Sequence, residues 1–193
     1  MREAGYSLIE LMFGLGLAAT LGAVAIPQFR TGVDDLRAAG AARYLTTKLR
    51  QVRMEAVTRS KDVALQFVRG PTGYTFAVYV DENGDGVRTR DIQSGMDRRI
   101  TPIERLPDLV GGVDFGVLPG LPPVESGSPA PGTDPIKLGS SDILTFTAIG
   151  TSSTGSLYLR SAGNAQYVVR VSGETGKTRV LKFDARLRQW KPQ

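Results

Sequence analysis

The sequence predicts an α+β protein in which one long N-terminal helix precedes a series of antiparallel strands. An apolar run extends from Tyr6 to Ile26, and a segment with helical apolar spacing follows it and ends near Ser60. From Val63 onward, apolar side chains alternate with a period of two between turns rich in Gly and Pro. A helix followed by strands that are neighbours in the chain is typical of α+β domains.

The composition narrows the classes of function. The chain has 193 residues, a formal net charge of +5, and neither Cys nor His. A Ser-His-Asp triad, a Cys-His dyad and a Cys/His zinc site are therefore excluded. No paired carboxylates suggest acid–base catalysis, so we expect a protein that is not an enzyme. The mild basicity is compatible with anionic partners but does not require them.

The apolar run, residues 6–27 with the closing Pro27, is predicted to be a transmembrane helix. As a helix, the run from Tyr6 to Ile26 extends roughly 31 Å, enough to cross the hydrocarbon core of a bilayer. Pro27 predicts a bend, because proline cannot donate the helical hydrogen bond. Residues 28–60 continue the helix in amphipathic form. The following apolar stripe is expected to pack on a sheet: Phe29, Val33, Leu36, Gly40, Leu45, Leu49, Val52 and Ala56.

The start of the apolar run also carries a motif. The stretch Gly5-Tyr6-Ser7-Leu8-Ile9-Glu10-Leu11 resembles the prepilin leader motif of type IV pilins and type II secretion pseudopilins. The resemblance implies that residues 1–5 are a cytoplasmic leader, that prepilin peptidase cuts after Gly5, and that the new amine of Tyr6 is N-methylated. It also implies a pilin-like fold and a single-pass protein of the bacterial cytoplasmic membrane. The head, residues 61–193, would be periplasmic or part of an extracellular filament.

Glu10 is the one charged residue of the apolar run. An ionisable residue inside a membrane segment is costly, by about 2.5–3.5 kcal/mol at the bilayer centre, and suggests a function. Glu10 could pair with the amine of Tyr6 in its own chain or extend to the lipid headgroups. The resemblance implies instead that it pairs with the Tyr6 amine of a neighbouring subunit during assembly.

The strands are predicted from period-two alternation. Val63, Leu65 and Phe67 alternate in one strand and Tyr74 to Val80 form the next, with Pro71-Thr72-Gly73 as the turn of a hairpin. Residues 119–139 are rich in Pro, Gly and Ser and are expected to form a surface loop. Later strands are expected at Val113–Leu118, Ile143–Ile149, Ser156–Arg160, Tyr167–Ser172 and Thr178–Asp184.

Two blocks in the second half extend the resemblance. Phe146 to Leu159 and Val171 to Val180 each combine strand residues with a glycine-containing turn, and they resemble blocks of the GspH/FimT branch of pilin-like proteins. This branch implies a minor pilin or pseudopilin, with other pilins as partners, in a type II secretion pseudopilus or a type IV pilus. Low-abundance members of the family prime or cap filaments, which implies a place in the initiation or tip complex.

An acidic stretch after the first hairpin has the opening of a calcium loop. Asp81, Asn83 and Asp85 have D-x-N-x-D-G spacing, and Asp91 follows one residue before the twelfth position of an EF-hand loop. Calcium is the cofactor that these oxygen donors would bind. The alternative is a polar loop in which the Asn-Gly and Asp-Gly pairs supply turn chemistry.

The C-terminus is basic. Arg186, Arg188 and Lys191 surround Trp190, and basic residues beside an aromatic ring suit contacts to nucleic-acid phosphates and bases. Solvated surface charge is the competing interpretation. Some proteins of the GspH/FimT branch take part in DNA uptake, so the resemblance implies DNA as an alternative partner for the head.

Overall fold

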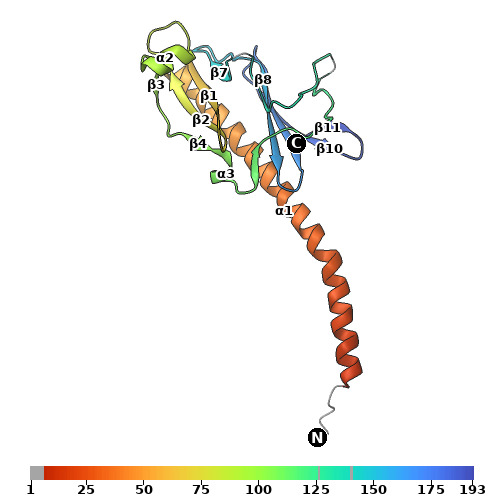
Figure 1. Cartoon of the computed structure of the whole chain (residues 1–193). Helices are drawn as coiled ribbons and strands as arrows, with labels where there is room; N and C mark the ends of the chain where they lie inside the picture. The colour runs from red at the N-terminus through yellow and green to blue at the C-terminus, as the bar shows by residue number, and fades with distance from the viewer. Residues whose placement is uncertain (1–6, 126, 140) are drawn as a thin grey trace. The chain divides into compact units, whose positions relative to one another are not determined.

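The computed structural model describes residues 7–125, 127–139 and 141–193. The helix α1 covers Leu8–Arg59, and the chain divides into two compact units after Val33 (Figure 1). The first unit contains the N-terminal part of α1. Within the described residues, no helix combines the length and apolar character that crossing a membrane requires.

The second unit begins with the remainder of α1, which ends where the sequence predicts. Ser60 leaves the helix with a φ of +51°, and the N–H groups of Ser60 and Lys61 bond to the carbonyls of Val57 and Ala56. These bonds satisfy carbonyls that would otherwise lack partners at the helix end. The chain then enters the first strand within a few residues.

The buried face of α1 matches the expected stripe in its second half only. Leu45, Leu49, Val52 and Ala56 are buried as predicted. Phe29, Val33 and Leu36 were expected to pack on a sheet, but they are exposed. The physical reason is that the buried face starts at Ala38 and continues through Ala41 and Ala42, whose small side chains permit close packing against the strands.

The first sheet is built on the predicted hairpin. β1 (Val63–Gly70) pairs with β2 (Gly73–Val80) in antiparallel register, with Gly70 opposite Gly73. Gly73 adopts a φ of +110°, which favours glycine at the end of this short turn. In the described residues the sheet has five strands in the order β3-β2-β1-β7, with β4 also on β2. The added strands are β3 (Arg98–Arg99), β4 (Glu104–Arg105) and β7 (Ile143–Phe146).

The second sheet contains the C-terminal strands. In the described part of the chain it has six strands in the order β11-β10-β9-β8-β5, with β6 paired to β8. Its strands are β5 (Val113–Phe115), β6 (Ile136–Lys137), β8 (Gly155–Ser161), β9 (Gln166–Val171), β10 (Thr178–Asp184) and β11 (Gln189–Pro192).

The predicted strands exist, with shorter bounds for β5 and β7, whereas β6 lies inside the stretch expected to be a loop. The short strands β3, β4 and β11 were not predicted. Strands of two to four residues give too little alternation for a period-two pattern to be detected.

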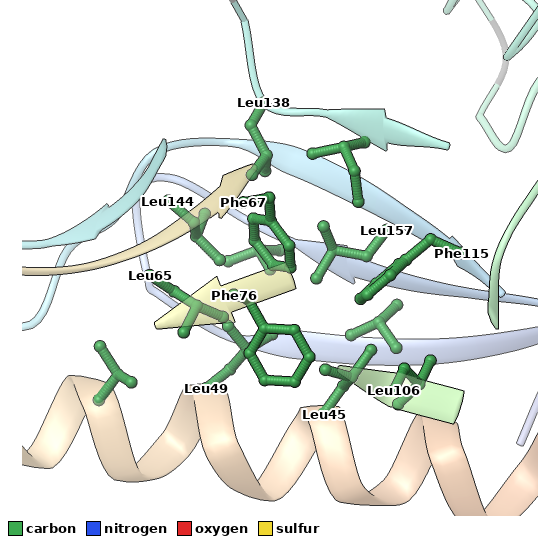
Figure 2. Packing of buried hydrophobic residues seen from close by; sticks show 14 of the residues in the cluster. Leu45, Leu49, Leu65, Phe67, Phe76, Leu106, Phe115, Leu138, Leu144 and Leu157 are labelled. Carbon is green, nitrogen blue, oxygen red and sulfur yellow. The ribbon is translucent and has the colours of Figure 1, made fainter. Parts of the chain in front are cut away.

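Both sheets contribute to one hydrophobic core above α1. Figure 2 shows Leu45 and Leu49 extending from the helix towards Leu65 and Phe76 of the first sheet, with Leu157 of the second sheet nearby. The ring of Phe115 packs edge-on against Phe67 and Phe76 with centroids 5.5 and 6.1 Å apart. The core therefore joins the helix and both sheets into one folded head.

The outer face of the first sheet is covered as well. Ala64 of β1 packs with Ile143 of β7 and with Val87, which belongs to the loop after β2. The short helix α2 (Thr89–Ser94) follows this loop and places Ile92 against the same cluster. A second short helix, α3 (Leu106–Leu109), buries Leu106 in the main core. Because β1 is covered on both faces, Ala64 and Gln66 are buried together with the alternating residues predicted to face the core.

Polar contacts fasten α1 to each sheet. Tyr167 of β9 donates its hydroxyl to Asp35 at 3.1 Å, and Lys182 of β10 lies 2.7 Å from the same carboxylate. On the first sheet, Glu104 of β4 accepts hydrogen bonds from Tyr44 and Lys48.

These contacts change the acidity of the two tyrosines. Burial raises the pKa of Tyr167 well above its ordinary value, and the charge of Asp35 and its hydrogen bond add to the effect. Burial, followed by the hydrogen bond and charge of Glu104, raises the pKa of Tyr44 in the same way. The neutral hydroxyl is therefore the form that the folded state favours at both positions.

Candidate functional site

The first part of α1 presents a continuous apolar surface. Its large apolar side chains are 54–77% exposed: Leu8, Ile9, Leu11, Met12, Phe13, Leu15, Leu17 and Leu21. Exposed apolar areas of this extent mark contacts with other proteins or with membranes. The chain therefore has a surface that is unsuited to water and requires a covering partner.

Glu10 lies in this apolar surface. It is the acidic residue in the first turn of α1 and its side chain is exposed. A negative charge in the first turn is stabilised by the partial positive charge of the helix N-terminus. The predicted processing site at Gly5 and Tyr6 lies outside the described residues. Position 27 lies within α1, and the bend at Pro27 stays a prediction.

The predicted calcium loop connects β2 to α2, and its own backbone satisfies its first carboxylate. Asp81 accepts N–H groups from Asn83 at 3.1 Å, Gly84 at 2.7 Å and Gly86 at 2.8 Å. Asp85 is exposed and forms an ion pair with Arg88 at 2.7 Å. Asp81 and Asp85 therefore have partners within the loop, and calcium binding by the four predicted residues stays a prediction.

The base of the same loop contains a carboxylate that the sequence did not suggest as a ligand. Asp97 is buried beside Asp91, and its amide donates to the Asp91 carbonyl at 3.1 Å. Burial raises the pKa of Asp97 above its ordinary value; the N–H groups of Arg88 and Glu82 oppose the shift, while the charges of Asp81 and Asp91 reinforce it. Across the described residues, no group of three or more acidic side chains is arranged so that it could hold a metal ion.

The C-terminal residues predicted to contact DNA have contacts within the chain. Trp190 donates its indole N–H to the Pro122 carbonyl at 3.1 Å and packs against the rings of Tyr158 and Phe183. Arg188 donates to the Gly120 carbonyl at 3.1 Å, and Lys191 pairs with Asp184 at 2.7 Å. Arg186 is exposed in the turn between β10 and β11. Trp190 and Arg188 thus hold residues 120–122 against the second sheet.

A second basic surface lies between α1 and the turn that joins β9 to β10. A hollow of about 490 Å³ is lined by Arg50 and Arg53 of α1 and by Lys177 and Arg179. Ser172, Thr175, Gly176 and Thr178 complete its lining, and none of the described residues that line it is acidic. We name these four cations and three hydroxyl residues the basic hollow. Arg50 and Lys177 are far apart in the chain, so no local pattern could have brought them together.

The fold defines a class of protein: a helix with an exposed apolar first part, followed by a head of antiparallel sheets packed on its second part. The model of the family described as type II transport protein GspH matches residues 41–176, and the chain belongs to this family. The match starts in the second part of α1 and ends in the turn at Gly176, so it covers most of the head.

Two individual proteins are similar to this chain. The pilin-like protein PilA1 of Thermus thermophilus is 35% identical over 89 residues, which cover 44% of this chain. The chain spans 53% of the length of that relative. The minor pseudopilin EpsH from the type 2 secretion system of Vibrio cholerae matches with a TM-score of 0.46 and 16% identity over 76% of this chain and 97% of that one.

Family membership confirms several expectations. The resemblance to GspH-type pilin-like proteins is confirmed, and so is the α+β fold with a helix packed on antiparallel sheets. The family consists of structural filament components and not of enzymes, which confirms the expectation of a non-catalytic protein. Membership supports a role in type II secretion or type IV pilus assembly and indicates an envelope-associated component.

Proposed function

We propose that this protein is a minor pilin or pseudopilin that assembles through its N-terminal helix into a type II secretion pseudopilus or a type IV pilus. The observation that carries the proposal is the exposed apolar surface of α1 on a chain whose head belongs to the GspH family. Other pilins or pseudopilins are the partners that would cover this surface in the filament. A low-abundance subunit of this type would act in the initiation or tip complex.

The proposal includes processing and membrane insertion. Prepilin peptidase would remove residues 1–5 and methylate the amine of Tyr6, and the apolar segment 6–27 would hold the subunit in the cytoplasmic membrane before assembly. Support comes from the motif around Gly5 and from the apolar side chains that follow it. Sequencing the N-terminus of protein isolated from cells with an active peptidase should give N-methylated Tyr6. An intact Met1 there would contradict this part of the proposal.

Glu10 would determine the position of the incoming subunit. Its carboxylate lies in an exposed apolar surface, where an ion pair with the Tyr6 amine of a neighbour would be poorly screened and strongly dependent on register. The Glu10→Ala variant should remain in the membrane fraction but be incorporated poorly, which is measured by its amount in sheared filaments. Glu55→Ala is the matched control, because Glu55 also lies on α1 but pairs with Arg59 at 2.7 Å. Normal incorporation of the Glu10 variant would overturn this role.

DNA binding by the head is a second candidate function, and the basic hollow favours it. Arginine and lysine with neighbouring hydroxyl groups are the donors that phosphate backbones meet in protein–DNA contacts. The C-terminal residues Arg186, Arg188 and Lys191 remain the alternative contacts. Trp190 is less suited to stack on bases because it packs against Tyr158 and Phe183.

A charge-matched pair of variants separates the two basic surfaces. Arg50→Gln/Lys177→Gln removes two cations from the basic hollow, and Arg186→Gln/Arg188→Gln removes two from the C-terminus. Binding to double-stranded DNA is measured by fluorescence anisotropy over a series of salt concentrations. The first pair of substitutions should weaken binding and reduce the slope of log affinity against log salt concentration by about 2, because two phosphate contacts are lost. The second pair should bind like the parent protein. Equal losses in both variants would mean that only net charge matters, and no DNA binding by the parent would remove this candidate.

A further inference from the structure

Two buried carboxylate oxygens in the segment from α2 to β3, which follows the loop after β2, have no hydrogen-bond partner. These atoms are Oδ2 of Asp91 and Oδ1 of Asp97, on residues that are 5% and 2% exposed. Most buried polar atoms in native proteins have a partner, so each exception needs a physical explanation. A carboxylate that loses water without gaining a partner is among the costliest exceptions.

The surroundings compensate these charges in part, through the other oxygen of each carboxylate. The ion pair of Asp91 is with Arg90, whose side chain is 82% exposed and whose Nε reaches Oδ1, the other carboxylate oxygen, at 3.3 Å. Asp97 uses its other oxygen, Oδ2, to accept the Arg88 N–H at 3.1 Å, and the Glu82 N–H also favours its charged form. Asp81 adds a third buried carboxylate to the same loop, although backbone N–H groups satisfy its oxygens. Three buried carboxylates therefore lie at the base of the loop, and two of their oxygen atoms accept no hydrogen bond.

The chemistry of the loop limits what could bind. Every candidate donor is an oxygen, which is the preference of hard cations such as calcium and magnesium. The loop also turns at Gly84 and Gly86 with φ values of +81° and +86°, and Gly86 donates to Asp81. The glycine at the sixth position of the D-x-N-x-D-G stretch therefore makes the sharp turn that such loops require.

We propose that Asp91 and Asp97 together bind a calcium ion at the base of this loop, with backbone carbonyls and water completing its coordination. The proposed site has two carboxylate ligands and draws the rest of its donors from the backbone and water, since the described residues contain no suitable group of three acidic side chains. Asp81 shapes the loop through its three N–H contacts, and Asp85 stays with Arg88. An irregular set of oxygen donors suits calcium better than magnesium, which demands near-ideal octahedral geometry.

The bound ion would stabilise one particular part of the head. Asp91 belongs to α2, and Asp97 directly precedes β3. Ile92 of α2 and Val87 of the preceding loop cover Ala64 on the outer face of the first sheet. A cation between Asp91 and Asp97 would close the segment from α2 to β3 and keep that cover in place. This inference is independent of filament assembly, so either proposal can fail alone.

The test uses the full-length protein in detergent, stripped of metal with a chelator. Isothermal titration calorimetry with calcium chloride should show a single calcium ion bound per chain. Calcium at a hundredfold excess over Kd should raise the Tm by about 5 °C or more, and added chelator should reverse the rise. Magnesium chloride at the same concentration should have a smaller effect. A parent protein with neither binding heat nor a Tm change in about 10 mM calcium, which exceeds the Kd of weak extracellular sites, would overturn the proposal.

Variants identify the ligands. Asp97→Asn and Asp91→Asn should each lose the binding heat and the calcium-dependent rise in Tm. Asp108→Asn, at an exposed carboxylate on α3, and Asp85→Asn should keep both. Circular dichroism without metal establishes that each variant is folded, and Asp91→Asn alone decides if Asp97→Asn does not fold. Calcium binding that survives in Asp91→Asn would place the ion elsewhere and overturn this assignment.

Discussion

At the scale of single residues, Gly176 shows how a glycine permits two segments of the head to pack closely. Gly176 forms the turn between β9 and β10 with a φ of +61°, and its backbone lies close to Gly150 and Arg53. Arg53 belongs to α1, so the turn and α1 lie close together at this point, and both residues line the basic hollow. Glycine suits this position because a Cβ atom would occupy the space that the neighbouring Gly150 and Arg53 fill.

Gly176→Ala should therefore destabilise the head. A Cβ at this position would lie 2.5 Å from the Gly150 carbonyl oxygen and 3.0 Å from Nε of Arg53, in addition to the strain of a positive φ. We expect a loss of about 2–4 kcal/mol in the free energy of unfolding, measured by urea denaturation. Gly84→Ala is the control, because its φ is also positive but nothing lies within 4 Å of the added atom. Equal losses for the two variants would show that the clash contributes nothing.

At the scale of elements, α1 has two parts with different surroundings. Its second part buries Leu45 and Leu49 in the core that it shares with both sheets, whereas its first part leaves large apolar side chains exposed. The apolar side chains of α1 therefore build the core in its second part and form an exposed surface in its first part. Leu36 lies at the transition, in the second unit of the chain but on an exposed face.

The pair Leu49→Ala and Leu36→Ala tests this division. Leu49 is fully buried, so its truncation should cost about 2–5 kcal/mol of unfolding free energy. Leu36 is 72% exposed, so the same substitution should change stability by less than about 0.5 kcal/mol. Urea denaturation of both variants in the same detergent measures the difference. A large loss for Leu36→Ala would mean that this side chain is covered in the isolated protein.

At the scale of the whole molecule, the helix and the two sheets are held by the shared core and by two tyrosine–carboxylate contacts. Tyr167 bonds to Asp35 and joins the second sheet to α1, and Tyr44 bonds to Glu104 and joins the first sheet to α1. The folded state raises the pKa of both tyrosines. Each therefore contributes stability that is fully present below the pKa of an unfolded tyrosine, about 10, and is lost as the pH rises above it.

The free energy of unfolding should accordingly fall as the pH increases above about 10, because the unfolded tyrosines lose their protons first. Tyr44→Phe/Tyr167→Phe should be less stable at neutral pH and show a shallower decline at alkaline pH. Urea denaturation at a series of pH values compares the two slopes, and because both proteins contain the same lysines, lysine titration affects both. Parallel declines would indicate that these hydroxyls do not contribute to the alkaline loss of stability.

Local sequence was sufficient to predict the longer elements and the turns that depend on residues close together in the chain. The end of α1 near Ser60, the hairpin around Pro71 and Thr72, and the strand at Thr178–Asp184 follow from periodicity and turn residues, and the structure confirms them. The motif beginning at Gly5 and the two later blocks led to the pilin-like family, which the match over residues 41–176 confirms. The role of Glu10 depends on a neighbouring subunit and stays a prediction.

Only the tertiary structure decided which side chains meet across the chain. Periodicity could not show that Phe29 and Leu36 stay exposed, because burial depends on where the sheets reach the helix. It could not place Asp97 beside Asp91, since that contact requires the chain to fold back after α2. It could not bring Arg50 to Lys177 either, because this approach depends on the order of strands in the second sheet. The sequence by itself thus determined the long helix, the longer strands and the family, and the packing of distant segments determined the short strands and the surfaces available for binding.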